Sequence, residues 1–196
     1  MLLQALSFLT NELNTYLKSE YQLLQAKATL AAHVSAGGSA AEDIQNQMSV
    51  TLINLEPEST VRNLLPDRSG SGVHSQLNPA LKLNLRVLFA ANFNDYTEAL
   101  KFLGSTLTFF QGHSVFTPQA YPLLDSAFSR LTVELETTSY QDWSYLWGML
   151  GTKHLPGVIY KIKMITIQDG VVLSTSPAIT TVDVTGIVRP APATAL

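Results

Sequence analysis

The stretch Leu81–Ala91, with the sequence LKLNLRVLFAA, constrains the fold more than any other part of the chain. Its odd-numbered positions are apolar throughout, whereas its even-numbered positions are polar until Leu88. This period of two is that of a β-strand with one face in a core and the other face polar over most of its length. The chain must therefore build a sheet, and other elements must cover the apolar face of that sheet.

Other segments show the same two-residue period and predict three more strands. They are Met48–Leu55, Leu131–Glu136 and Val158–Ile167. The sequence Gln-Asp-Gly that follows the last of these is typical of a hairpin turn, and it predicts a partner strand at Val171–Leu173. We expect one further short strand near Thr180–Val184.

The N-terminal part of the chain predicts a helix followed by irregular segments. Over residues 2–20, apolar side chains recur at spacings of three and four and form one stripe. We expect the helix to continue as far as Ala32 and a flexible loop to occupy residues 33–46. Residues 56–80 contain three prolines and a Gly-Ser cluster, so they predict a loop or a pair of strand ends beside a mobile tip.

Two later helices begin at recognisable N-caps. Asp95 and Glu98 have the spacing of a capping box, in which two side chains satisfy the first free amides of a helix, and Gly112 is a suitable end. Ser139 predicts the cap of a helix over residues 140–154, which a Leu-Pro-Gly run ends.

Because helices separate the central strands only twice, these elements predict an α+β fold with a mixed, mainly antiparallel sheet and helices packed on one face. The other face carries the charged side chains, with opposite charges on neighbouring strands. These are Lys82, Arg86, Glu134, Glu136, Lys161 and Lys163. We expect a single domain over residues 1–188 and a flexible tail over residues 189–196, which is rich in Pro, Ala and Thr.

Charge and cysteine content exclude several classes of protein. The 196 residues include only 14% charged residues and have a net charge of −3, so the chain has no basic excess with which to bind nucleic acid. The absence of cysteine excludes disulfide scaffolds, thiol nucleophiles and cysteine-ligated metals. No apolar run is long enough to insert into a membrane, and Met1–Leu17 lacks the positive region of a signal peptide.

The sequence contains no pattern that predicts catalysis, a cofactor or a metal. Its four histidines have no partner at a metal-binding spacing, and we interpret them as unrelated surface residues. Ser71 and His74 lack the strand-to-helix elbow that a nucleophilic serine needs. Trp143 and Trp147 lie one helical turn apart, and we expect both to pack mainly in the core, with an oligomer interface as the alternative.

Three stretches together resemble a known family. They are Gln4–Leu17, Asn78–Pro118 and Leu131–Ile167. Their most specific parts are VLFAANFNDYTEALKFL, FFQGHSVFTP and LWGMLGTKHLPGVIYKIKM. These motifs resemble the tail-terminator, or cap, proteins of contractile injection systems, which are phage-tail-like particles of the antifeeding-prophage and virulence-cassette types. The resemblance covers about residues 1–170.

The resemblance implies a structural role without catalysis or cofactor. Proteins of this family form a homo-hexameric ring that ends the inner tube and engages the last layer of the sheath. The particle is assembled in the bacterial cytoplasm and is then released or tethered to a membrane. A ring of this kind needs large contacts between copies, and a chain with few charges and exposed strand edges suits such contacts.

Two departures from the family pattern bear on this expectation. Some members carry an additional C-terminal domain, and residues 21–46 are longer and richer in alanine than we expect for the family. We predict that the segment 62–80 and the strands over 171–185 face neighbouring subunits, because they are long and poor in charge. The candidate interface residues are Arg62, Asn63, Leu64, Leu65, Asp67, Arg68, Val171, Val172, Leu173, Thr181 and Val182.

Two other functions remain open from the sequence. One is a different structural adaptor of the same particle, at the tube end or at the baseplate. The other is an enzyme or a small-molecule binder that uses residues 62–80 as a lid. This second alternative predicts a concave polar pocket lined by Arg62, Asp67 and His74.

Overall fold

The computed structural model describes residues 1–34, 44–58, 68–69, 73–77, 81–167 and 172–177. The chain divides into two compact units. The first comprises residues 1–62 and 81–167, and the second comprises residues 63–80 and 168–196.

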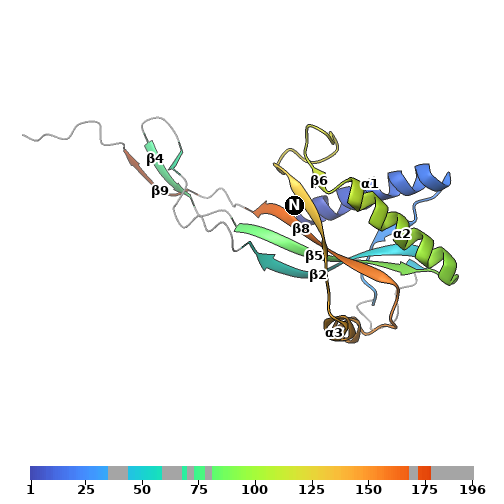
Figure 1. Cartoon of the computed structure of the whole chain (residues 1–196). Coiled ribbons are helices and arrows are strands. Elements are labelled where there is room, and N and C mark those ends of the chain that lie inside the picture. Colours follow the sequence, from blue (N-terminus) through green and yellow to red (C-terminus); the bar gives the residue numbers. More distant parts are fainter. Residues whose placement is uncertain (35–43, 59–67, 70–72, 78–80, 168–171, 178–196) are drawn as a thin grey trace, which may run out of the picture. The chain divides into compact units, whose positions relative to one another are not determined.

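A six-stranded sheet forms the centre of the first unit (Figure 1). Its order is β1-β2-β5-β8-β7-β6, and its neighbours are antiparallel except for the parallel pair β1 and β2. The predicted α+β fold with a mixed, mainly antiparallel sheet is confirmed. The strands are β1 (Ala28–Leu30), β2 (Gln47–Pro57), β5 (Leu81–Asn92), β6 (Val115–Phe116), β7 (Leu131–Glu136) and β8 (Gly157–Ile167).

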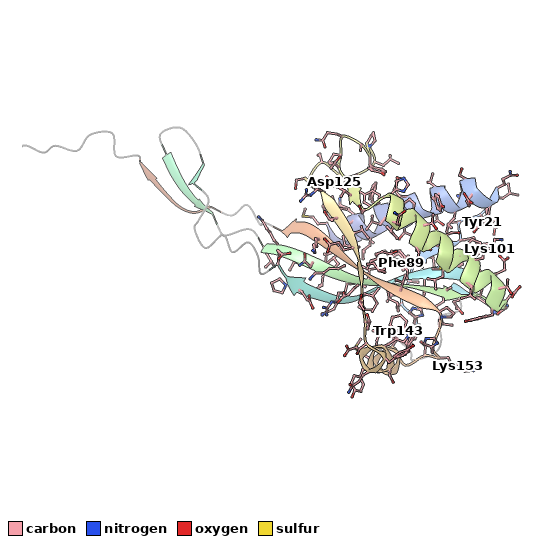
Figure 2. The ribbon with its side chains drawn as sticks, viewed as in Figure 1. Tyr21, Phe89, Lys101, Asp125, Trp143 and Lys153 are labelled. Atoms are coloured by element: carbon pink, nitrogen blue, oxygen red, sulfur yellow. The ribbon has the colours of Figure 1, made fainter. Side chains whose placement is uncertain are left out.

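Two helices cover one face of this sheet, α1 (Leu2–Tyr21) and α2 (Tyr96–Gly112). From Leu85 onward the odd-numbered side chains of β5 lie beneath them, as the alternation in the sequence predicts, whereas Leu81 at the start of the strand is 49% exposed. Phe89, labelled in Figure 2, is fully buried, and its ring contacts those of Phe110 and Tyr160. This is the larger of the two apolar clusters in the described part of the chain.

A third helix, α3 (Tyr140–Leu150), packs on the opposite face of the sheet. Its buried side chains Leu146 and Trp147 contact Leu88, Ala90 and Ile159. The expectation that all helices lie on one face was therefore wrong. The reason is that the even-numbered positions of β5 become apolar from Leu88 onward, and that half of the second face needs a cover of its own.

The segment after α1 is a strand and not a continuation of the helix to Ala32. The helix ends at Tyr21, and Gln22 adopts a left-handed conformation with a φ of 52°. The buried side chain of Asn14 then binds the returning chain: its Oδ1 accepts from the amides of Lys27 (2.9 Å) and Ala28 (2.8 Å), and its Nδ2 donates to the Ala28 carbonyl (2.8 Å). This amide ties the start of β1 to α1, and β1 itself pairs in parallel with β2.

The predicted N-caps of α2 and α3 are confirmed, with two differences in detail. Asp95 accepts from the Thr97 amide at 2.8 Å, but Glu98 pairs with Lys101 and does not complete a capping box. Ser139 caps α3, which ends at Leu150 and not at His154, because Gly151 takes a left-handed conformation with a φ of 67°.

The second unit contains a three-stranded antiparallel sheet in the order β3-β4-β9. Its strands are β3 (Arg68–Ser69), β4 (Val73–Leu77) and β9 (Val172–Pro177). The predicted pair of strand ends within residues 56–80 is confirmed by β3 and β4. The predicted hairpin after residue 167 was wrong, because β9 pairs with β4 instead of β8. The strand expected at Thr180–Val184 lies outside the described residues.

Candidate functional site

One half of the second sheet face is held together by ion pairs between neighbouring strands. Arg86 lies at its centre, with Nη1 2.8 Å from Glu56 and Nη2 2.8 Å from Glu136. Lys163 pairs with Glu134 at 2.6 Å. The expectation that opposite charges face one another across the strands is confirmed. These side chains are half-buried and neutralise one another, so this half of the face is a polar layer of ion pairs.

The other half of this face contains a cluster of rings around Trp147. His33 and His154 each contact Trp147 edge-on, with ring centroids 5.6 Å away in both cases. His33 is only 3% exposed, and its Nε2 lies 3.1 Å from Ser49 Oγ. The interpretation of the histidines as unrelated surface residues was wrong for His33, which is buried. His154 is exposed, as expected, although its ring also contacts Trp147. Burial lowers the pKa of His33, so the neutral imidazole is the form that fits this site.

The two tryptophans differ in their surroundings. Trp147 is buried, and its indole Nε1 has no hydrogen-bond partner within the described part of the chain. Trp143 is only partly buried and lines two pockets. The prediction of a core role is confirmed for Trp147, whereas Trp143 contributes both to packing and to the surface.

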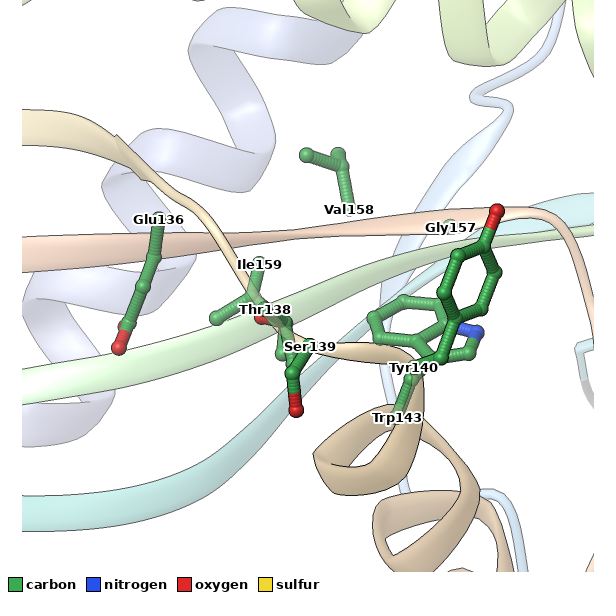
Figure 3. A pocket seen from close by; sticks show the side chains of 8 residues that line it. All are labelled: Glu136, Thr138, Ser139, Tyr140, Trp143, Gly157, Val158 and Ile159. Atoms are coloured by element: carbon green, nitrogen blue, oxygen red, sulfur yellow. The ribbon is translucent and has the colours of Figure 1, made fainter.

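These two pockets lie beside the first residues of β8, which extend beyond the end of β7 at Glu136. The smaller one has a volume of about 280 Å³ and is shown in Figure 3. It is lined by Glu136, Thr138, Ser139, Tyr140, Trp143, Gly157, Val158 and Ile159. The larger one has a volume of about 590 Å³ and is lined by Ala91, Phe93, Asn94, Tyr96, Ala99, Leu103, Trp143, His154, Leu155, Pro156 and Gly157. Both pockets combine aromatic and aliphatic side chains with polar ones, and they share Trp143 and Gly157.

Gly157 is required at this position by the close approach of β5. A Cβ atom on Gly157 would lie 2.9 Å from the Phe89 carbonyl oxygen and 3.3 Å from the Ala90 Cα. Both contacts involve backbone atoms, which cannot move aside without distorting the sheet. The glycine therefore allows β8 to begin close against β5.

The structure brings together some of the predicted interface residues. Arg68 lies in β3, and Val172 and Leu173 lie in β9. Both strands pair with β4, so segments about one hundred residues apart in the chain share one sheet. The remaining candidates lie outside the described residues: Arg62, Asn63, Leu64, Leu65, Asp67, Val171, Thr181 and Val182.

Of the three residues expected to line an enzyme pocket, His74 lies in β4, and Arg62 and Asp67 lie outside the described residues. Within the described ranges, no group of three or more His, Asp or Glu side chains is placed to hold a metal ion. None of the helices described is both long enough and apolar enough to cross a membrane.

A family model for the Pvc16 N-terminal domain matches residues 5–181. The chain belongs to the Pvc16 N-terminal domain family. This confirms the family resemblance of the sequence motifs, and the match includes both the six-stranded sheet and the strands of the second unit.

Two solved structures have the fold of this Pvc16 N-terminal domain. One is the PVC sheath/tube terminator of an extracellular contractile injection system in the extended state, with a TM-score of 0.58 and 11% identity; 94% of this chain aligns with 65% of that chain. The other is the tube-terminating cap of the anti-feeding prophage, with a TM-score of 0.58 and 11% identity; 90% of this chain aligns with 60% of that chain. The chain thus spans less than two thirds of either. A comparison with curated protein sequences gave no match.

Proposed function

We propose that this chain is a structural terminator of a contractile injection particle. In this function it forms a homo-hexameric ring that ends the inner tube and engages the last sheath layer. The observation that carries the proposal is the family match over residues 5–181, together with a shared fold with two proteins that are described as a sheath/tube terminator and a tube-terminating cap.

The surface chemistry of the described residues supports a role in assembly. Several large apolar side chains are exposed on different elements, and Tyr140 on α3 is 96% exposed. The outer strands of the sheet β3-β4-β9 are β3 and β9, and within the described residues each is paired with β4 alone. Exposed apolar side chains and open strand edges are the features through which protein copies associate.

The terminator proposal includes partners, location and the absence of enzymatic activity. The inner tube protein and the sheath protein are the proposed partners, without nucleic acid and without insertion into a membrane. The particle is assembled in the bacterial cytoplasm. We assign no catalytic residue and no cofactor, and we retain residues 1–188 as the terminator domain.

The experiment that tests this function is deletion of the chain from a cell that makes the particles, followed by electron microscopy. Loss of the terminator should leave tubes of uncontrolled length or particles with an open end, and re-expression of the chain should restore a uniform length. Particles of normal length with closed ends in the deletion strain would contradict the terminator function. An additional density at the baseplate that is lost on deletion would support the adaptor alternative instead.

A further inference from the structure

The edge of the main sheet is open at the beginning of β8. Gly157 is opposite Ala90 of β5, and the Ala91 amide donates to the Pro156 carbonyl at 2.8 Å. Because successive residues of a strand direct their N–H and C=O groups to opposite edges, the N–H and C=O of Gly157 point away from β5. On that side β7 has already ended at Glu136, and no backbone hydrogen bond to Gly157 occurs there within the described ranges.

The two pockets lie on the two faces of this open edge. Tyr96, Ala99 and Leu103 of α2 line the larger pocket, whereas Ser139 and Tyr140 of α3 line the smaller one. These helices cover opposite faces of the sheet. A strand that pairs with Gly157 sends successive side chains to opposite faces, and so into the two pockets in turn. Addition of a strand to an edge, with pockets for alternate side chains, is an established mode of peptide recognition.

The charges at this groove favour an uncharged occupant. Apart from tyrosines, the only ionisable residues among those that line the two pockets are Glu136 and His154. Glu136 already pairs with Arg86 at 2.8 Å. A charged side chain buried here would lose its hydration without gaining an unpaired opposite charge, whereas an uncharged strand would bury apolar area and satisfy the backbone of Gly157.

We propose that a second copy of the chain occupies this groove and that its strand β9 pairs with the open edge at Gly157. The β9 sequence VLSTSP has no charged residue, and within the described residues it is paired only with β4. The groove and the strand are different surfaces, so the contact is head-to-tail and repeats around a ring or along a filament. This inference rests on the proposed function, because a terminator ring needs such a contact between copies.

The first test measures the mass of the protein in solution for charge-bearing variants of the groove. Tyr96→Asp and Tyr140→Asp place a carboxylate at the rim of each pocket, and each should raise the dissociation constant for self-association at least tenfold. Tyr145→Asp is the matched control, because Tyr145 is 65% exposed, like Tyr96 at 66%, but lines neither pocket. Thermal unfolding of each variant should show that it remains folded. The inference would be overturned if all three variants weakened self-association equally or if neither groove variant weakened it. A wild-type protein that remains monomeric at high concentration would overturn it as well.

The second test exploits the absence of cysteine from the chain. Copies that carry Tyr140→Cys and a long tag are mixed with untagged copies that carry one cysteine at a position from 172 to 176, and the mixture is oxidised. A strand in the groove should give heterodimers only at alternate positions, because every second side chain faces Tyr140. Leu24→Cys replaces Tyr140→Cys as the control, since Leu24 is 98% exposed outside the groove. Cross-linking equal to this control at all five positions would refute the contact.

Failure of this contact and failure of the terminator function give different results. If groove variants still form rings and still restore tube length in the deletion strain, the contact between copies is elsewhere and the function stands. If the deletion strain makes particles of normal length, the function fails whatever the cross-links show.

Discussion

On one face of the six-stranded sheet, helices of 20 and 17 residues bury a large cluster of side chains; on the other face, one helix of 11 residues buries a small one. The remainder of the second face is polar and ion-paired. The difference teaches that the two faces of one sheet can be covered unequally, with most of the apolar packing on one side and ion pairs beside a short helix on the other. The first face fixes the fold, and α3 with its surroundings presents side chains to solvent.

The largest loss of stability is expected from a substitution on the first face. Phe89→Ala removes a fully buried ring that contacts Phe110 and Tyr160. It should lower the free energy of unfolding by about 3–5 kcal/mol, because apolar area and packing are lost together. Urea denaturation followed by circular dichroism measures this change. A loss below about 1 kcal/mol would contradict the assignment of this face as the main source of stability.

The next effect concerns the start of β8, where both faces meet. Gly157→Ala places a Cβ 2.9 Å from the Phe89 carbonyl oxygen, and we expect a loss of about 1–3 kcal/mol from overpacking. Gly148→Ala is a matched control, since a Cβ at that helical position meets no atom within 4 Å. The control should be neutral or stabilising by up to about 1 kcal/mol. If both variants behave alike in thermal unfolding, steric contact at Gly157 is not the cause.

A smaller loss of stability should distinguish α3 on the second face from α1 and α2 on the first. Ser139→Ala removes the cap of α3, where Ser139 Oγ accepts from the Asp142 amide at 3.1 Å. We expect a cost of about 1 kcal/mol, expressed as faster hydrogen exchange in α3 while α1 and α2 stay protected. Exchange that rises equally in all three helices would show that α3 opens only with the whole domain.

The smallest effect should depend on pH through His33. Because burial lowers its pKa below the ordinary 6.5, the unfolded chain binds the proton more readily than the folded chain. The stabilisation is therefore complete above pH 6.5 and declines as the pH falls below it, by at most about 1.4 kcal/mol per pH unit. The groups around His33 are Ser49 and Trp147, with Lys153 on the wall of the same pocket.

His33→Gln is the variant that isolates this contribution. Thermal unfolding of the wild type and of the variant should be compared at pH 7.5 and at pH 5.5. The difference in their stabilities should shrink at the lower pH. A difference that is the same at both values would exclude His33 as the titrating group.

The first face could be predicted well from the sequence. The period of two in Leu81–Ala91 and the exact span Leu131–Glu136 are local patterns, and the N-caps at Asp95 and Ser139 depend on neighbouring residues only. Such features are encoded within a few residues, and local signals of this kind are the ones that sequence analysis detects best.

The second face, and the pairings between segments that are distant in the chain, could not be predicted to the same extent. The cover of the second face depends on a switch from polar to apolar residues at Leu88. The start of β1 is bound by a side chain fourteen residues away in α1. The partner of β9 is β4, about one hundred residues earlier. The open edge at Gly157 follows from where β7 ends. Each is a relation between distant segments, and no local pattern contains it.

The three hydrogen bonds of Asn14 have a consequence for how the protein ages. An amide can accept from two backbone N–H groups and still donate to a carbonyl, as Asn14 does toward Lys27 and Ala28. Spontaneous deamidation to aspartate would replace the donor with a second acceptor, and two oxygens would then oppose each other at the Ala28 carbonyl. The loss of one nitrogen atom would thus weaken the tie between α1 and β1, and the backbone pairing with β2 would have to hold β1 alone. The helical backbone around Asn14 hinders that reaction, so the fold protects the amide on which its edge depends.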